Sequence, residues 1–117
     1  MLRRIRAEGE GPDNPTELAN MKLNVQSIHF DADSKLIDYV REKLLKLTQF
    51  TDGIHSADVF LRLDHDGEER QNKVVEVRLA VPGNDFFAKR QGKTFEEATI
   101  DVTAALRSQI LRSRDRQ

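Results

Sequence analysis

The sequence lacks the features that mark several common classes of protein. It contains no cysteine, which excludes disulfides and the usual cysteine-based zinc sites and is compatible with a reducing compartment. No run approaches the roughly 20 apolar residues of a membrane span, and the first residues lack the apolar segment of a secretory signal. We therefore expect a cytoplasmic protein that does not associate with membranes.

Residue patterns for catalysis are also missing. His29, His55 and His65 stand in separate segments and show no metal-binding spacing. Four acids gather between Asp64 and Glu69, but carboxylate catalysis needs a pocket with opposed environments, so an acidic solubilising loop explains them better. Neither a glycine-rich phosphate loop nor a serine-hydrolase motif is present. The sequence predicts a protein without enzymatic activity, cofactor, bound metal or small-molecule substrate.

The charge of the chain is nearly balanced but unevenly distributed. A net charge of −1 gives no bulk argument for a polyanionic partner. However, the last thirteen residues hold four arginines and one aspartate, whereas Asp64 to Glu69 holds four acids and neither lysine nor arginine. Such a molecule can bind a polyanion through its basic end. A chance distribution of charges explains the pattern equally well from composition alone.

The periodicity of the apolar residues predicts one α+β domain. Alternation predicts strands over residues 22–28, 57–65, 73–81 and 86–91, and helical spacing predicts helices from about Ser34 to Thr48 and from Phe95 onward. Asp33 precedes the first helix as an N-cap, and Thr94 with Glu97 forms a capping box before the second. The order is β-α-β-β-β-α. We expect a four-stranded sheet with both helices on one face.

Two further expectations concern the ends and the aromatic residues of this domain. Residues 1–20 are rich in glycine and proline and show no period, so we predict a flexible N-terminal extension, followed by the folded domain over residues 21–117. Phe60, Phe86 and Phe87 fall on predicted strands. Although exposed sheet aromatics can stack on RNA bases, the absence of an RRM-type motif favours core packing for at least two of them.

Basic residues collect on one flank of each predicted helix. Lys35, Tyr39, Lys43 and Lys46 share a flank of the first helix, and Arg107, Arg112, Arg114 and Arg116 end the second. If the helices lie side by side, these flanks merge into a surface for phosphates, and about six contacts would give a salt slope near −4 to −5. Lys89 and Arg90 are additional candidate contacts. A solvated face is the alternative explanation for the first stripe.

The domain from Met21 to Gln117 resembles the ribosome hibernation promoting factors and ribosome-associated inhibitors, also called sigma-54 modulation proteins. The resemblance rests on three groups of residues in order: Lys43-Leu44-Leu45-Lys46-Leu47 with Phe50 and Ile54; Gln91-Gly92 with Phe95 and Ala98; and Leu106, Arg107, Gln109 and Ile110 before the basic tail. It covers most of the chain and implies a β-α-β-β-β-α fold similar to that of double-stranded RNA-binding domains. No single group is a signature, but their order and spacing are fairly specific.

This resemblance implies a non-enzymatic protein that binds the small ribosomal subunit and its rRNA in the channel used by mRNA and tRNA. Such a protein silences translation in slow growth or stress, and we expect a monomer away from the ribosome. The family pattern assigns rRNA contacts to Lys43, Lys46, Arg107, Arg112, Arg114 and Arg116. The chain departs from it at Ser108 and Ile100, where relatives commonly carry a basic residue and an aspartate. Because the chain ends just after the second helix, it resembles the short forms.

A protein-interaction regulator similar to the sigma-factor modulators is the alternative function. In that case the acidic segment from Asp64 to Glu69, or the sheet face that the helices leave open, would dock another protein. Ionic strength distinguishes the two functions, because phosphate binding weakens steeply with salt and apolar docking does not.

Overall fold

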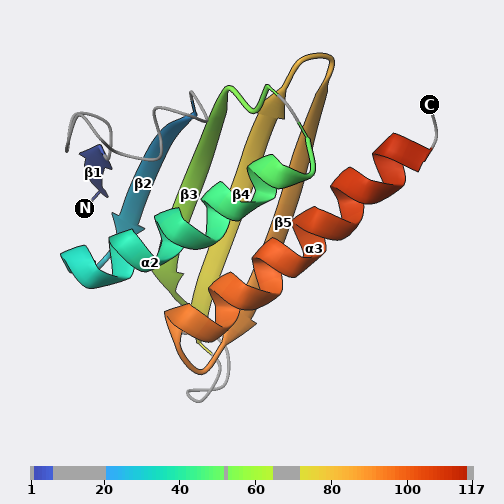
Figure 1. Ribbon diagram of the computed structural model, residues 1–117. Coiled ribbons are helices and arrows are strands. Elements are labelled where there is room, and N and C mark those ends of the chain that lie inside the picture. The colour runs from blue at the N-terminus through green and yellow to red at the C-terminus, as the bar shows by residue number, and fades with distance from the viewer. Residues whose placement is uncertain (1, 7–20, 52, 65–71, 116–117) are drawn as a thin grey trace.

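The computed structural model describes residues 2–6, 21–51, 53–64 and 72–115 (Figure 1). Five strands form a single sheet in the order β1-β2-β3-β4-β5. β2 and β3 are parallel, and the other neighbouring strands are antiparallel. The elements are β1 (Leu2–Arg6), β2 (Lys22–Ile28), α2 (Ser34–Leu45), the 3₁₀ helix η1 (Lys46–Gln49), β3 (Ser56–Leu63), β4 (Lys73–Val81), β5 (Asn84–Gly92) and α3 (Phe95–Asp115).

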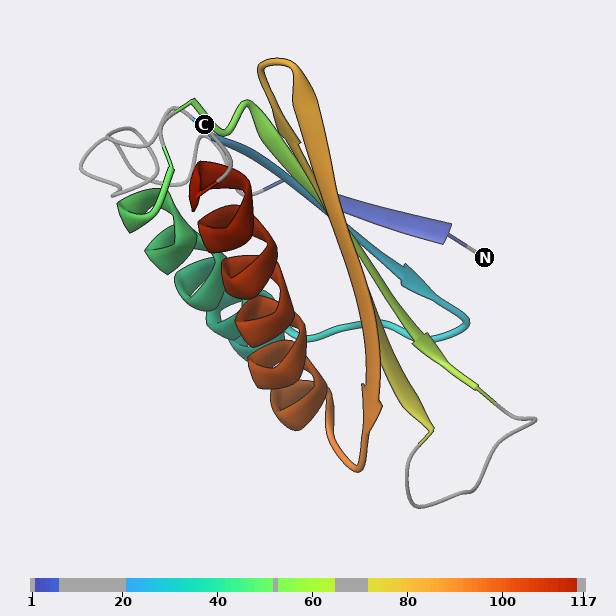
Figure 2. The same cartoon turned by 90° about the vertical axis from the view of Figure 1, so that its right-hand side faces the viewer.

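The predicted order β-α-β-β-β-α is confirmed from β2 to α3, with both helices on one face of the sheet (Figure 2). Alternation along the strands explains this arrangement, because every second side chain points toward the helices. Val25, Val59, Val77 and Ala88 occupy one row across four strands, and all four are buried. The sheet therefore presents a continuous apolar surface that must be covered.

The helices cover this surface with apolar stripes at helical spacing. α2 contributes Leu36, Ile37, Val40 and Leu44, and α3 contributes Ala98, Val102, Leu106 and Ile110. Burial of each large side chain stabilises the fold by roughly 1.5–3 kcal/mol before the entropy cost of folding. The core thus fixes how far each helix is rotated about its axis, and with it the direction of the polar residues on the outer side.

Of the three sheet phenylalanines, only Phe86 belongs to the core. The expectation that at least two of them pack there is wrong. Neighbouring residues of a strand point to opposite faces, so burial of Phe86 turns Phe87 to the open face, where it is 46 % exposed. Phe60 alternates with the buried Val59 and Leu61 and lies opposite Glu76 of β4 on the same open face.

Residues 2–6, which lie within the predicted N-terminal extension over residues 1–20, form strand β1. β1 pairs antiparallel with β2, from Leu2 opposite Ile28 to Arg6 opposite Asn24. Backbone groups make this pairing, so it requires no side-chain period, and the outer edge of β2 offers unpaired N–H and C=O groups to any neighbouring segment. The sheet consequently has five strands instead of four. Residues 7–20 lie outside the described part of the chain.

Both predicted helix starts are confirmed by their caps. The Asp33 carboxylate accepts a hydrogen bond from the Leu36 amide at 2.8 Å, and the Thr94 hydroxyl accepts one from the Glu97 amide at 3.0 Å. The first helix differs at its end, where α2 gives way after Leu45 to η1. There the Thr48 hydroxyl donates to the Leu45 carbonyl at 2.7 Å, which satisfies a carbonyl left free at the helix end.

α2 and α3 run in the same direction across the sheet (Figures 1 and 2). Their C-terminal halves therefore lie at the same end of the molecule, with η1 next to α3. The negative ends of the two helix dipoles point the same way, which favours cations at this end. The fold thus brings the basic part of each helix to one place.

Candidate nucleic-acid interface

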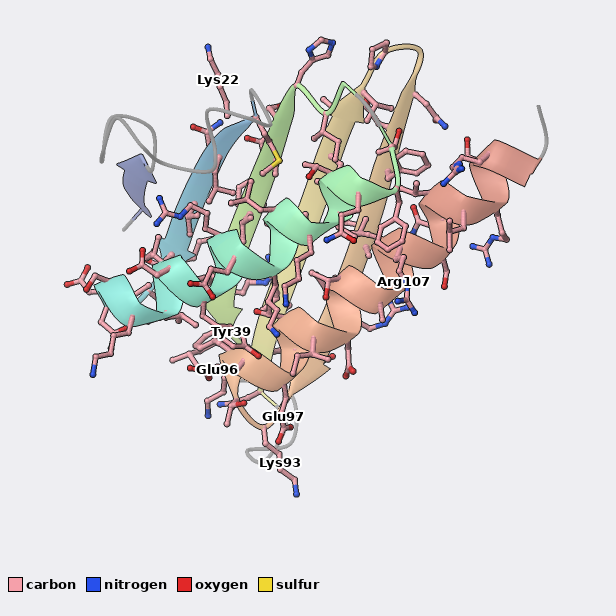
Figure 3. The ribbon with its side chains drawn as sticks, viewed as in Figure 1. Lys22, Tyr39, Lys93, Glu96, Glu97 and Arg107 are labelled. Atoms are coloured by element: carbon pink, nitrogen blue, oxygen red, sulfur yellow. The ribbon has the colours of Figure 1, made fainter. Side chains whose placement is uncertain are left out.

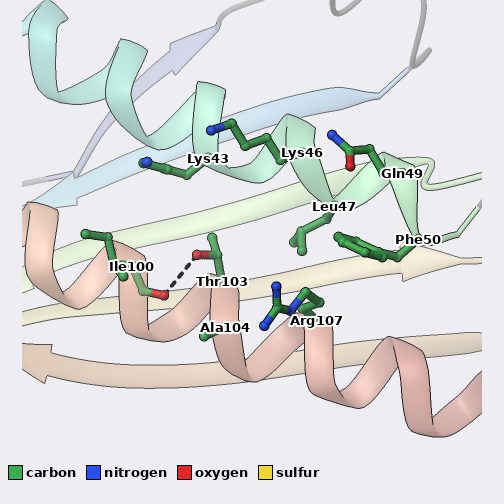
Figure 4. A pocket seen from close by; sticks show the side chains of 9 residues that line it. All are labelled: Lys43, Lys46, Leu47, Gln49, Phe50, Ile100, Thr103, Ala104 and Arg107. Atoms are coloured by element: carbon green, nitrogen blue, oxygen red, sulfur yellow. Dashed lines mark hydrogen bonds between the residues drawn. The ribbon is translucent and has the colours of Figure 1, made fainter.

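A groove of about 370 Å³ runs between α2–η1 and α3 on the outer side of the helix layer (Figure 4). Each wall follows the spacing i, i+3, i+4, i+7, which places its residues on one face of a helix. One wall consists of Lys43, Lys46, Leu47 and Phe50, with Gln49 beside them, and the other consists of Ile100, Thr103, Ala104 and Arg107. The rotation of the helices set by the core therefore determines which side chains face each other here.

Aromatic rings position two of the cations. The Lys43 ammonium lies 5.2 Å from the centre of the Tyr39 ring, and the Arg107 guanidinium lies 6.0 Å from the centre of the Phe50 ring. Arg114, two turns further along α3, donates a hydrogen bond to the Phe50 carbonyl at 3.3 Å. Phe50 is thus contacted by two arginines of α3, which connects the end of η1 to the opposite wall.

The predicted phosphate-binding cations have no carboxylate partner within the described ranges. The ion pairs found there join Arg41 to Asp38 at 3.4 Å and Arg62 to Glu76 at 2.6 Å. Neither pair includes a residue of the groove. Figure 3 shows Lys93, Glu96 and Glu97 at the start of α3, whereas Arg107 lies farther along the helix. The positive charge around the groove is therefore available to an external anion.

The structure brings together some of the predicted site residues. Lys43, Lys46 and Arg107 line the groove, and Arg114 contacts Phe50 at its end. Arg112 is exposed on α3. Arg116 lies outside the described residues. The central part of the predicted surface therefore forms one site contributed by both helices.

The four additional candidates are more dispersed. Tyr39 is half-buried next to Lys43, and Lys35 is exposed in the first turn of α2. Lys89 lies on the open face of the sheet, opposite Glu76, because its neighbour Ala88 points into the core. Arg90 is exposed on β5 and donates to the Lys89 carbonyl at 2.8 Å. Of these residues, only Tyr39 contacts a residue of the groove.

Phe50 and Ile100 line the groove, although the sequence pattern assigned neither of them a contact with a ligand. A signal for Phe50 exists, since it continues the spacing of Lys43, Lys46 and Leu47. Gln109 lies on α3 away from the groove, and its side chain bonds the backbone of the edge strand β5. Its amide nitrogen donates to the Phe87 carbonyl at 2.7 Å, and its oxygen accepts from the Phe87 N–H at 3.3 Å. This pair anchors the second half of α3 to β5.

Other kinds of site find no support among the described residues. That part of the chain contains no group of three or more histidine, aspartate or glutamate side chains arranged to hold a metal ion. It also contains no helix long and apolar enough to cross a membrane.

The model of the sigma 54 modulation protein / S30EA ribosomal protein family matches residues 23–117. The chain belongs to this family. The match spans the whole groove, including both of its walls.

Individual relatives are similar to this chain in sequence, and solved structures are similar to it in fold. The ribosome hibernation promoting factor of Acinetobacter guillouiae is 22 % identical over 102 residues, and that of Pseudomonas putida strain KT2440 is 25 % identical over 97 residues; each match covers 83 % of this chain and 90 % of the relative. The N-terminal domain of Thermus thermophilus protein Y superimposes with a TM-score of 0.65 at 22 % identity, covering 77 % of this chain and 92 % of that domain.

A ribosomal subunit interface protein from Coxiella burnetii superimposes with a TM-score of 0.64 at 12 % identity, covering 81 % of this chain and 97 % of that protein. At such identities the superpositions establish a shared fold. Which residues of this chain bind a ligand has to be argued from its own geometry.

Proposed function

We propose that this protein is a non-catalytic ribosome hibernation factor. It binds the small ribosomal subunit through rRNA in the channel used by mRNA and tRNA, and it silences translation during slow growth or stress. The observation that carries this proposal is the convergence of Lys43, Lys46 and Arg107 on one groove between two helices, without carboxylate partners among the described residues. The family match and the names of the relatives support it.

Folded RNA suits this surface because proteins recognise it largely through shape and through the positions of its phosphates. The cations project from helices whose rotation the core holds in place, so their spacing is preserved before binding. The net charge of −1 does not oppose the interaction, since salt screens charges beyond about 8–10 Å and the local charge dominates. A protein that occupies the channel blocks it sterically and needs no catalytic group. Its site of action is the cytoplasm, where it binds as a monomer.

Co-sedimentation with purified small subunits tests the proposal. The double variant Lys43→Glu/Arg107→Glu reverses two charges at the groove. The matched control is Lys22→Glu/Arg78→Glu, which makes the same change in net charge at two exposed positions on the open sheet face. We expect the groove variant to lose binding and the control to bind like the unmodified protein. Equal binding by the two variants would show that the groove is not the ribosome-binding surface.

A second candidate function is docking of another protein on the open sheet face, in line with the sigma 54 modulation part of the family description. Phe87 favours it, because this large apolar side chain is 46 % exposed on that face. Of the predicted acidic segment from Asp64 to Glu69, residues 65–69 lie outside the described residues. Docking of this kind depends little on ionic strength, whereas rRNA binding weakens steeply with salt. A salt titration of the ribosome complex therefore separates the two functions.

A further inference from the structure

The groove has more apolar lining than phosphate binding requires. Leu47 forms a buried base, 3 % exposed, while Ile100 on the facing wall is 49 % exposed. Ala104 and Phe50 add further apolar surface. Phosphates need only cations that reach into solvent, but a concave surface of about 370 Å³ lies within the roughly 300–1,000 Å³ range of pockets for organic groups. The lining indicates a ligand that combines a flat apolar part with negative charge.

Phe50 and Arg107 form a stacking surface at one end of this groove. The guanidinium carbon lies 6.0 Å from the ring centre, and the main chain of Phe50 is bound by Arg114 at 3.3 Å. The main chain of Phe50 is therefore anchored before a ligand arrives, and the Arg107 guanidinium lies beside its ring. Unpaired RNA bases stack on aromatic rings and on arginine guanidinium planes in this manner.

The lysines lie where the charged part of the same ligand would lie. Lys43 and Lys46 occupy the wall that also carries Phe50, about two turns and one turn before it, respectively (Figure 4). A base against Phe50 would leave its neighbouring phosphates beside these ammonium groups. A base-paired helix keeps its bases inside the stack and would leave the apolar lining empty. An acidic peptide would satisfy the lysines but offers no flat ring for Phe50 and Arg107.

We propose that the groove binds one unpaired nucleobase of single-stranded RNA, stacked against Phe50 and Arg107, with the adjoining phosphates on Lys43 and Lys46. This inference rests on the proposed function and specifies which part of an rRNA the groove takes. It distinguishes single-stranded segments from duplexes.

Fluorescence anisotropy with labelled RNA measures this preference directly. The probes are a single-stranded RNA, a hairpin duplex with the same number of phosphates, and the single strand with abasic nucleotides at its centre. The protein is expected to bind the single strand more tightly than either of the other probes. Phe50→Leu should lower the affinity for the single strand roughly tenfold, the typical effect of losing one stacking contact, without changing its salt dependence or the affinity for the duplex.

The matched control is Phe87→Leu, the same substitution on the opposite face of the sheet. It should leave all three affinities unchanged. Because Phe50 also packs against the core, its variant is first checked by thermal unfolding. Ile100→Ala shortens an exposed side chain of the groove wall and provides a second test. It should lower the affinity for the single-stranded RNA and leave the affinity for the other two probes unchanged. Full single-strand affinity in both groove variants, or loss in Phe87→Leu instead, would overturn the inference.

Competition experiments identify the ligand class. Displacement of the labelled strand by unlabelled single-stranded RNA, with little effect of polyglutamate or a free mononucleotide, supports the inference. Equal displacement by polyglutamate would assign the groove to an acidic protein, and equal displacement by the mononucleotide would assign it to small nucleotides.

Failure of this inference can be distinguished from failure of the proposed function. Ribosome binding that depends on Lys43 and Arg107 but not on Phe50 or Ile100 would refute the base-binding groove alone. Absence of ribosome binding by the unmodified protein would refute the function.

Discussion

The hydrogen bonds between Gln109 and Phe87 offer a quantitative test of how α3 is held. β5 is the last strand of the sheet, so the outward backbone groups of Phe87 have no strand to pair with. The Gln109 side chain occupies both of them, at 2.7 and 3.3 Å. Gln109→Met keeps the length of the side chain and a similar helix propensity while it removes both bonds. The variant therefore isolates this anchor.

We expect the variant to lower the free energy of unfolding by about 1–2 kcal/mol. A neutral hydrogen bond contributes about 0.5–1.5 kcal/mol net to stability. Because the bond at 3.3 Å is longer than the usual 2.7–3.2 Å, its contribution should lie near the lower end of this range. Water can reach Phe87, which is 46 % exposed. The freed backbone groups therefore become hydrated, and the full cost of a buried unpaired group does not apply.

Urea denaturation measures this difference, with an unchanged m-value as the sign that the variant unfolds in the same way. The thermal midpoint should fall by roughly 4–10 °C, given the usual scaling for a domain of this size. Gln49→Met is the control, because Gln49 is exposed and makes no side-chain hydrogen bond within the described part of the chain. If the free energy of unfolding of Gln109→Met lies within about 0.3 kcal/mol of that of the unmodified protein, these hydrogen bonds do not stabilise the fold.

Three further predictions concern the helix cap, the salt dependence and the N-terminal segment. Thr94→Ala removes the hydrogen bond to the Glu97 amide and should cost about 0.5–2 kcal/mol in urea denaturation; an unchanged midpoint would contradict the cap. Ribosome binding should weaken less steeply with salt in Lys46→Gln. The slope of the logarithm of the binding constant against the logarithm of the salt concentration should decrease in magnitude by about 0.7–0.9, whereas an unchanged slope would mean that Lys46 contacts no phosphate. A protein that lacks residues 1–20 should still unfold cooperatively on heating, as measured by circular dichroism, because the described core begins at Met21. Loss of the cooperative transition would show that the folded domain includes part of residues 1–20.

Local patterns predicted most of the fold because their causes are local. A capping hydrogen bond spans three residues, as between Asp33 and Leu36, and the apolar periods of the helices and strands follow from the backbone geometry of each element. The same alternation determines that Phe87 and Lys89 leave the helix-covered face. The wrong expectation for the phenylalanines rested on the absence of an RRM-type motif and did not apply this alternation.

Features made by backbone pairing or by distant residues were not predictable in this way. β1 binds the edge of β2 through main-chain groups, which leave no mark in the side-chain pattern. Arg114 and Phe50 are 64 residues apart in the sequence, and Gln109 and Phe87 are 22 apart. Such contacts exist only after the helices have packed against the sheet.

The helical period of the apolar residues is enough to predict which side of each helix faces the core and which basic residues remain outside. That the two basic flanks meet follows from the packing of the helices on the sheet. The sheet holds α2 and α3 parallel and adjacent, so Lys43, Lys46 and Arg107 line one groove and Phe50 and Ile100 complete it. The physical reason is that helical periodicity sets directions about one axis, whereas the spacing and order of two axes depend on the packing between them.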